Sequence, residues 1–132
     1  MPTMIVSGSG GLIGSEAVAH LVRAGYDVVG LENDMRARFF GPEASTAHTT
    51  ERLLRTFGGS FSSLDIDIRD RDGVDRVLAK HARSLELVVH TAAQPSHDWA
   101  ASDPHTDFEV NANGTLNLLE ATRRHAPAAT FI

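Results

Sequence analysis

Four glycines between residues 8 and 14 have a spacing that could hold a phosphate group. They stand in the segment GSGGLIG, which lies between a short apolar run and a helical pattern. In such a G-x-x-G-x-x-G arrangement the first glycine permits a tight turn, the second lets backbone N–H groups approach a pyrophosphate, and the third lets helix and strand pack closely. The helix N-terminus adds a positive partial charge. The spacing indicates a dinucleotide-binding turn, although a glycine-rich turn without a ligand explains this feature alone equally well.

An acidic residue, Glu32, follows the next apolar run and lies about 20 residues beyond the glycines. At the end of a second strand, such a carboxylate can accept hydrogen bonds from the hydroxyls of an adenosine ribose. It would also repel the 2′-phosphate of NADP, so the sequence favours NAD as the cofactor. Arg36 lies close by and keeps NADP open as an alternative. A solvated acid at a strand end is the plainer interpretation of Glu32.

Polar and small residues also follow the third and fourth predicted strands. Asp67 and Ile68 end the third strand, and the segment HTAAQP (residues 90–95) ends the fourth. Because ligands of open α/β sheets bind at the carboxyl ends of the strands, we expect these residues to converge there. Ala92 and Ala93 would let a planar group pass close to the backbone. Ordinary packing at a strand end is the alternative for these two residues.

The elements that must position these residues alternate along the chain. Strands are predicted at residues 4–7, 26–31, 61–68 and 85–91, with a fifth beginning at residue 130, and helices at residues 13–24, 50–57, from Asp70 or Asp72 to His81, and 107–125. Residues 32–45 are polar and irregular, so a long loop is expected there. Apolar strands that alternate with amphipathic helices predict an α/β fold, a doubly wound parallel sheet with the strand order 3-2-1-4-5.

The last predicted helix carries one amide, Asn111, on a mostly apolar face. The residues of that face are three or four positions apart: Phe108, Asn111, Thr115, Leu118, Leu119 and Thr122. A buried amide must find hydrogen-bond partners. Asn111 is therefore expected either to bridge to a neighbouring strand or to take part in the site, and the sequence favours neither.

The composition excludes several classes of protein. With 132 residues, 42% apolar and 22% charged, the chain is long enough and apolar enough for one globular domain. The net charge of −5 argues against a nucleic-acid partner or an anionic membrane surface, and no apolar stretch could span a membrane. The chain has no cysteine and its histidines show no metal-ligand spacing, so we expect no metal site and a cytoplasmic location.

Five segments, in order, resemble the NAD-dependent epimerase/dehydratase family, the extended short-chain dehydrogenases. They are SGSGGLIG (7–14), LEN (31–33), DIRD (67–70), HTAAQ (90–94) and NANGTLNLLEA (111–121), and the resemblance covers essentially the whole chain. It implies a Rossmann fold that is cut within its fifth strand, with residues 1–132 as an incomplete NAD-binding domain. It also implies NAD as the cofactor.

The resemblance assigns roles to residues at matching positions. It implies NAD contacts from Gly8, Gly11, Leu12, Ile13 and Gly14, from Glu32 and Asn33 on the adenosine ribose, and from Asp67 and Ile68 beside the adenine. Ala92, Ala93 and Gln94 would flank the nicotinamide half, and Asn111 would brace the site. Glu32 departs from the aspartate that is commoner in the family, which changes the length of the side chain and leaves its charge the same.

Residues 94–99 (QPSHDW) and 36–52 are most similar to the branch of the family that epimerises CDP-linked deoxyhexoses. The resemblance therefore implies that the full-length enzyme removes a hydride from a carbon of a nucleotide-linked deoxyhexose and returns it to the opposite face. The nucleotide sugar would be its partner. A 4-epimerase or a 4,6-dehydratase is the alternative, because these enzymes share the front half of the chain.

The catalytic residues of that family have no counterpart in this chain. They are a Ser or Thr and a Tyr-x-x-x-Lys motif, which the single tyrosine and lysine, Tyr26 and Lys80, cannot form. We therefore expect the catalytic and sugar-binding parts to be absent. A non-catalytic dinucleotide-binding module is the alternative if the chain naturally ends at Ile132. An end inside an apolar strand would leave an open edge, so we also expect a homo-oligomer.

Overall fold

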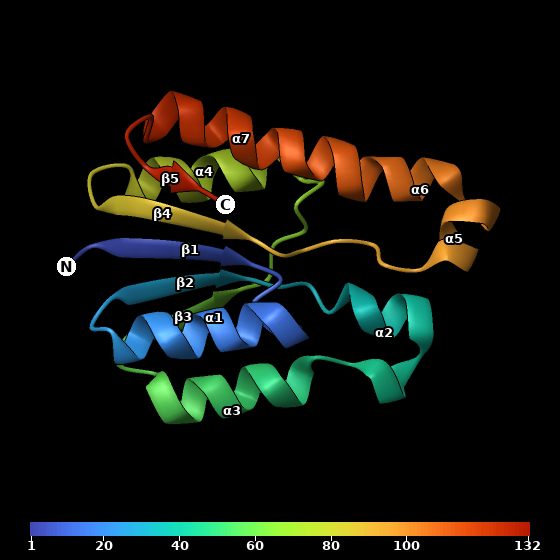
Figure 1. Ribbon diagram of the computed structural model, residues 1–132, viewed down its shortest axis with the longest axis horizontal. Helices are drawn as coiled ribbons and strands as arrows, with labels where there is room; N and C mark the ends of the chain where they lie inside the picture. The colour runs from blue at the N-terminus through green and yellow to red at the C-terminus, as the bar shows by residue number, and fades with distance from the viewer.

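A computed structural model describes residues 1–132 as one parallel sheet with helices on both faces (Figure 1). The strands are β1 (Thr3–Ser7), β2 (Asp27–Leu31), β3 (Phe61–Leu64), β4 (Leu85–His90) and β5 (Thr130–Phe131). All neighbouring pairs are parallel and the order is β3-β2-β1-β4-β5. The predicted doubly wound topology with β1 at the centre is confirmed.

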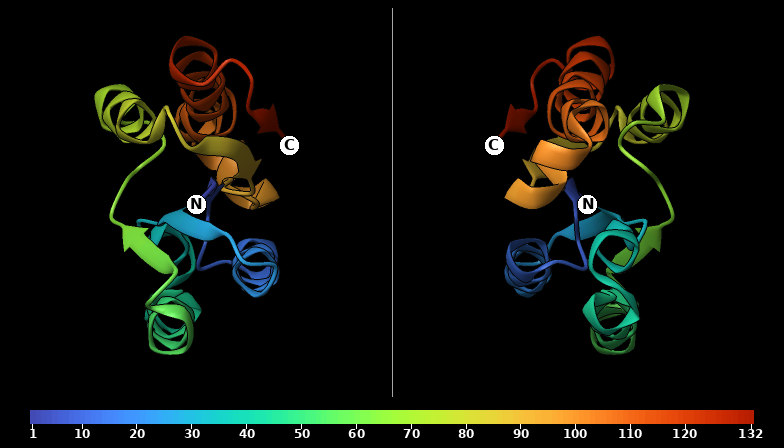
Figure 2. Two further views of the ribbon diagram at one scale, coloured as in Figure 1. Left: turned by 90° about the vertical axis from the view of Figure 1, so that its left-hand side faces the viewer. Right: turned by 90° about the vertical axis from the view of Figure 1, so that its right-hand side faces the viewer.

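Four longer helices cover the sheet, two on each face. Helices α1 (Leu12–Arg23) and α3 (Ala47–Phe57) lie on one side, and α4 (Arg71–His81) and α7 (Gly114–His125) on the other (Figure 2). Shorter elements are α2 (Met35–Phe40), a 3₁₀ turn (Pro42–Ala44), α5 (His97–Ser102), α6 (Pro104–Phe108) and a π-helical turn (Glu109–Asn113). None of these helices combines the length and the apolar character that a membrane crossing requires.

The central strand β1 contributes side chains to both apolar layers. Ile5, which is fully buried, packs with residues of α4 and α7, whereas Met4 and Val6 pack with residues of α1 and α3. Successive strand residues point to opposite faces, so a strand that is buried on both faces reads as a continuous apolar run. Each such buried aliphatic side chain contributes roughly 1.5–3 kcal/mol of stability. The core therefore fixes the end of β1, from which the glycine turn starts.

The third strand is shorter than the sequence predicted. It was expected over residues 61–68, but it ends at Leu64. Beyond it, the carboxylate of Asp67 accepts a hydrogen bond of 2.9 Å from the N–H of Arg69, and the carboxylate of Asp70 caps α4 by accepting a backbone hydrogen bond of 3.0 Å. Aspartates that bond the backbone two or three residues ahead stabilise turns and helix starts. This turn chemistry ends the strand despite the apolar pattern.

The segment predicted as a long loop contains a short helix, α2, and α3 begins earlier than expected, at Ala47. Asp34 starts α2 in the left-handed conformation, with φ of 54°. Its carboxylate accepts hydrogen bonds of 2.5 Å from Ser45 Oγ and 2.8 Å from the N–H of Thr46. Aspartate tolerates this conformation better than most residues. One carboxylate thus joins the two ends of the segment. The prediction of a long loop over residues 32–45 is wrong for residues 35–40, which form α2.

The predicted inward face of the last helix is correct at Leu118 and Thr122, which are buried, and wrong at two of its large apolar residues. Phe108 and Leu119 were expected inside, but they are 61% and 45% exposed. The buried positions of this region are Val110, Gly114, Leu118, Ala121 and Thr122. The π-helical turn inserts an extra residue into one turn of the helix and so rotates the face that follows it. Gly114, which has no side chain to mark a face in the sequence, packs directly against Ile68.

Candidate functional site

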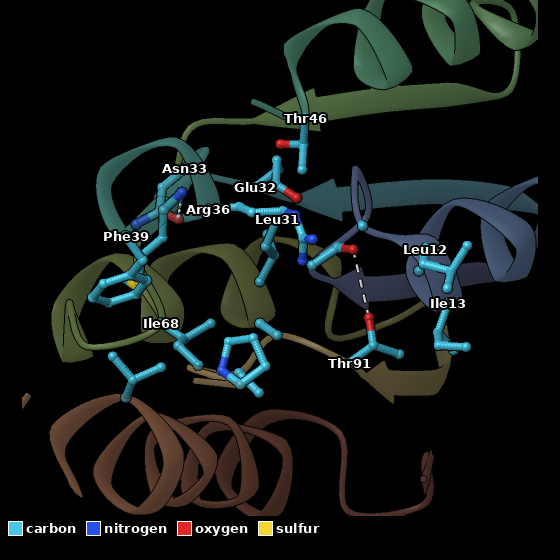
Figure 3. Close-up of a pocket in the computed structure, with 18 of the residues that line it drawn as sticks. Leu12, Ile13, Leu31, Glu32, Asn33, Arg36, Phe39, Thr46, Ile68 and Thr91 are labelled. Atoms are coloured by element: carbon cyan, nitrogen blue, oxygen red, sulfur yellow. Dashed lines mark hydrogen bonds between the residues drawn. The ribbon is translucent and has the colours of Figure 1, made fainter. Parts of the chain in front are cut away.

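A cleft of about 270 Å³ opens at the carboxyl ends of β1, β2 and β4 (Figure 3). It is lined by Gly8, Gly11, Leu12, Ile13, Gly14, Leu31, Glu32, Asn33, Met35, Arg36, Phe39, Thr46, Ile66, Ile68, Thr91, Ala92, Ala93, Pro95 and Val110. All the candidate residues from the sequence are among them except Asp67, Gln94 and Asn111. The structure therefore gathers predicted residues from four separate segments of the chain around one cavity.

The glycine turn brings β1, α1 and the loop after β4 into close contact. Gly8 has φ of 69°, a conformation that residues with a side chain rarely adopt, and its N–H donates to Leu31 O at 2.8 Å. A Cβ atom added to Gly8 would lie 2.9 Å from the backbone nitrogen of Ala92, and one added to Gly14 would overlap the carbonyl oxygen of Gly8. Two of the glycines are therefore required by steric contact alone.

The N-terminus of α1 faces this cleft without a cap. The N-cap residue is Gly11, no side chain accepts a hydrogen bond there, and the first turn contains no acidic residue. The N–H groups of a first helical turn have no partner within the helix, and they carry the positive end of the helix dipole. Gly11, Leu12 and Ile13 all line the cleft. No side chain occupies the N–H groups of this first turn, and their partial positive charge suits a pyrophosphate. This end of the helix therefore fits the phosphates of a dinucleotide.

Glu32 lies beside the glycine turn, and both of its carboxylate oxygens accept hydrogen bonds from backbone N–H groups. Oε2 accepts a hydrogen bond of 2.9 Å from the N–H of Gly10, and Oε1 accepts one of 2.8 Å from the N–H of Asp34. A carboxylate has about four acceptor positions, so two remain for hydroxyl groups of a ligand. Arg36 lines the same part of the cleft, with its guanidinium 5.3 Å from the centre of the Phe40 ring.

The loop after β4 forms the other wall. Thr91 Oγ1 donates to Ser7 O at 2.7 Å, and Ala92, Ala93 and Pro95 line the cleft. Gln94 points away from it: the residue is 4% exposed. Its Nε2 donates to Ser96 O at 3.0 Å and to Asp107 Oδ1 at 2.8 Å. The structure therefore places Gln94 behind the wall.

Asn111 supports the same loop from the π-helical turn. Its Oδ1 accepts a hydrogen bond of 2.8 Å from the N–H of Gln94, and its Nδ2 donates to Gln94 O at 3.0 Å. The amide thus pairs with both backbone groups of one residue. Of the two alternatives that the sequence left open, the structure shows a bridge, which runs to the loop after β4.

Asp67 lies outside the cleft and is engaged by Arg69. The guanidinium donates through Nε and Nη2, with a distance of 2.7 Å from Nη2 to Asp67 Oδ2. Partial burial alone would raise the pKa of the Asp67 carboxyl, but the hydrogen bonds and the charge of Arg69 hold this pKa below its ordinary value. Ile68, the next residue, does line the cleft.

Asp34 and Thr46 were missed by the sequence analysis. Thr46 lines the cleft and is almost fully buried, and Asp34 Oδ1 accepts hydrogen bonds from its N–H and its hydroxyl. Partial burial would raise the pKa of Asp34, but the hydrogen bonds from Ser45 and Thr46 lower this pKa overall. Asp34 lies in the segment 32–45 that was expected to be irregular, and Thr46 directly follows it, before the helix predicted from residue 50, so neither gave a periodic signal.

An aromatic contact beside the cleft was also missed. Phe39 of α2 lines the cavity, and its ring centre lies 5.2 Å from that of Trp99 in α5. Trp99 Nε1 donates to Phe39 O at 3.0 Å. The spacing of these two residues in the sequence, 60 positions apart, gave no sign of this contact. No group of three or more His, Asp or Glu side chains is placed to hold a metal ion.

Comparison with known proteins relates this arrangement to nucleotide-sugar enzymes. The family model described as "NAD dependent epimerase/dehydratase family" matches residues 4–132. A UDP-glucose 4-epimerase of Mus musculus is 31% identical over 125 residues, which are 95% of this chain and 35% of that protein. A CDP-paratose 2-epimerase of Salmonella typhi is 29% identical over 122 residues, 92% of this chain and 33% of that protein.

Solved structures show the same fold. A UDP-glucose-4-epimerase from Stenotrophomonas maltophila, solved with bound NAD and formylated UDP-arabinopyranose, superposes with a TM-score of 0.78 and 28% identity. The match covers 99% of this chain and 36% of that one. The chain thus spans about a third of the length of the curated relatives it matches.

Proposed function

Because the chain belongs to the NAD-dependent epimerase/dehydratase family, we propose that its cleft binds NAD across the carboxyl ends of β1, β2 and β4. The observation that carries this proposal is that the uncapped N-terminus of α1 and the Glu32 carboxylate line one cavity. A dinucleotide needs both features, a cationic cradle for its phosphates and an acceptor for its ribose. When bound, NAD supplies a hydride acceptor.

The proposed contacts follow from where each residue lies. The N–H groups at the start of α1, from Leu12 onwards, hold the pyrophosphate, and Glu32 with Asn33 accepts the ribose hydroxyls. The adenine lies beside Ile68 and Arg36, and the nicotinamide half lies along Ala92 and Ala93. Asp67, Gln94 and Asn111 act from outside the cleft, by fixing the turn after β3 and the loop after β4.

Isothermal titration calorimetry of the chain with NAD tests the site, and the variant Leu12→Glu tests the phosphate cradle. Leu12 is 85% exposed and is the first residue of α1. A carboxylate at this position stabilises the helix through its interaction with the helix dipole, but it repels phosphates. We therefore expect an intact fold with an NAD affinity at least about tenfold lower. His20→Glu is the matched control, because it adds the same charge to an exposed position of α1 remote from the cleft. Equal binding by all three proteins would contradict the proposal.

We further propose that residues 1–132 are the cofactor-binding part of a longer nucleotide-sugar epimerase. The proposed substrate is a CDP-linked deoxyhexose. It is supported by the likeness of residues 94–99 to the branch that acts on such sugars and by the relative from Salmonella typhi. In the second candidate, a UDP-linked sugar is epimerised at carbon 4, which is favoured by the identity to the enzyme of Mus musculus.

An assay of the whole protein separates these candidates. The protein is incubated with CDP-linked and UDP-linked hexoses, and NMR identifies the carbon whose configuration is inverted. Inversion of a CDP-linked sugar supports the first candidate, and inversion at carbon 4 of a UDP-linked sugar supports the second. Turnover of neither class would contradict both.

We also propose that the protein self-associates through the outer face of α6 and α7. Phe108, Leu116 and Leu119 are 61%, 57% and 45% exposed along this face. Apolar side chains gathered on one exposed face are typical of an interaction surface. Light scattering is expected to give more than one chain per particle, and Leu119→Glu is expected to shift this mass towards that of one chain. A monomer at every concentration would contradict the proposal.

A further inference from the structure

His90, the last residue of β4, connects three elements around the cleft through both of its ring nitrogens. Its Nδ1 lies 2.7 Å from Ser7 Oγ, at the end of β1. Its Nε2 lies 2.8 Å from Thr115 Oγ1, in the first turn of α7. The ring is half-buried and packs near Phe131 of β5, at 6.1 Å between ring centres.

The other partners of the two hydroxyl groups fix the direction of each hydrogen bond. Ser7 Oγ accepts hydrogen bonds of 3.1 Å and 3.2 Å from the N–H groups of Thr91 and Ala92, the first of which is shared with Ser7 O at 3.2 Å. With two N–H groups directed at this oxygen, its proton is free to be donated to His90 Nδ1. Thr115 Oγ1 donates its own proton to Asn111 O at 2.7 Å, so it must accept from His90 Nε2. The ring is therefore neutral, with its proton on Nε2.

The resulting series of hydrogen bonds joins the two supports of the cleft wall. At one end, Ser7 holds the N–H groups of Thr91 and Ala92. At the other end, Asn111 holds both backbone groups of Gln94. These contacts bracket the loop that lines the cleft, and His90 is the residue that links them. The nearest acid in the series is Asp107, which accepts from the Asn111 side chain at 3.1 Å.

We propose that His90 is a positioning residue for the cofactor site, and that its neutral form with the proton on Nε2 holds the loop of residues 91–95 in the place that NAD requires. The inference rests on the proposed function. It requires a group that accepts from Ser7 and donates to Thr115 at the same time. A protonated imidazole cannot do this, because it has no acceptor nitrogen, and its second N–H would compete with the N–H groups of Thr91 and Ala92 for Ser7 Oγ.

Two substitutions separate this role from simple packing. His90→Phe keeps a ring of similar size but removes both hydrogen bonds, and we expect NAD to bind roughly tenfold more weakly. His90→Gln offers one acceptor and one donor in a fixed arrangement and does not titrate, so we expect affinity within about threefold of the wild type. His20→Gln, at an exposed position of α1, is the control.

The pH dependence of NAD affinity gives a second measurement. Binding to the wild type is expected to weaken as His90 becomes protonated, and binding to His90→Gln is expected to lose this dependence. If His90→Phe does not fold, the comparison of the wild type with His90→Gln still decides, and an unchanged pH profile in His90→Gln would overturn the proposal. Equal affinity of a folded His90→Phe variant would overturn it as well.

Two readouts do not depend on NAD. Nitrogen-15 NMR of the ring is expected to show a neutral imidazole with its proton on Nε2 at neutral pH, and a proton on Nδ1 would overturn the proposal. Amide hydrogen exchange of Thr91 and Ala92 is expected to be faster in His90→Phe than in the wild type. If both readouts come out as expected but the wild type binds no NAD, the proposed function is refuted. The series of hydrogen bonds is then confirmed with a purely structural role.

Discussion

Glu32 Oε2 accepts a hydrogen bond of 2.9 Å from the N–H of Gly10, so the acid after β2 is joined to the glycine turn after β1. The other carboxylate oxygen is held by the N–H of Asp34 at 2.8 Å. The carboxylate is thus already oriented by the chain itself. A ligand that binds to it does not have to order the side chain, which favours affinity and selectivity.

The first prediction is a preference for NAD over NADP that depends on Glu32. Its carboxylate accepts ribose hydroxyls and repels a 2′-phosphate, and a charge-assisted hydrogen bond contributes about 1.5–3 kcal/mol. Glu32→Ala is therefore expected to lower NAD affinity roughly tenfold or more and to reduce the preference. Calorimetric titration of both cofactors measures this. Asp65→Ala is the control, because it removes an exposed acid directly after β3. Equal affinities of the wild type for NAD and NADP would contradict the prediction.

The second prediction concerns the stability of the glycine turn. Gly14→Ala places a Cβ atom against the carbonyl oxygen of Gly8, which is backbone and cannot rotate away. We expect the free energy of unfolding to fall by about 1–3 kcal/mol or more. Gly59→Ala is the control, because no atom lies within 4 Å of the added methyl group, and its effect is expected to stay within about 0.5 kcal/mol. Urea unfolding measures both, and equal midpoints would contradict the steric argument.

The third prediction is a loss of stability in mild acid. Burial lowers the pKa of His90, and burial together with the charge of Lys80 lowers the pKa of His81, so the folded chain binds protons less readily at both sites than the unfolded chain does. Stability is therefore fully present above the ordinary histidine pKa of about 6.5 and decreases as the pH falls from there towards the lowered values.

Urea unfolding at pH values between about 7.5 and about 5.5 checks this expectation, since the carboxylates titrate mainly below that range. His90→Gln and His81→Gln are each expected to remove part of the pH dependence. His20→Gln is expected to keep it, because that residue is exposed. Identical slopes for the wild type and His90→Gln would show that His90 is not the group responsible.

The fourth prediction concerns Asp34, whose carboxylate holds Ser45 and Thr46. Asp34→Asn keeps a residue that tolerates φ of 54° but removes the charge, so we expect a loss of about 1 kcal/mol. Asp34→Ala removes every acceptor and is expected to lose more, about 2–3 kcal/mol. Hydrogen exchange of the Thr46 amide and urea unfolding report the effect. If Asp34→Ala were as stable as the control Asp65→Asn, the carboxylate would not hold this segment.

The topology could be predicted from the sequence because burial on both faces of a parallel sheet leaves a direct trace. Val28, Val29 and Leu31 form a continuous apolar run for this reason, and Gly8 and Gly14 recur at a spacing that steric contact demands. Their position between β1 and α1 could thus be inferred without coordinates.

Other features depend on contacts between distant residues and left no local pattern. The hydrogen bonds from Ser45 and Thr46 to Asp34 make α2 possible, but nothing in the spacing of these residues indicates a partnership. The π-helical turn is similar: it directly precedes Gly114, which packs against Ile68, and the sequence around it shows no local pattern for either feature. The inward face of the last helix was therefore predicted correctly at Leu118 and Thr122 but wrongly at Phe108 and Leu119.

The contact between Trp99 and Phe39 has a kinetic consequence. It ties α5, which follows β4, to α2, which follows β2 (Figure 1). Phe39 lines the cleft, so we expect a bound dinucleotide to lie beside this contact and its release to be easier when the two helices separate. The hydrogen bond and the ring contact are then expected to change the rates of entry and release in the same direction, and so to affect the residence time of a bound dinucleotide more strongly than its equilibrium affinity.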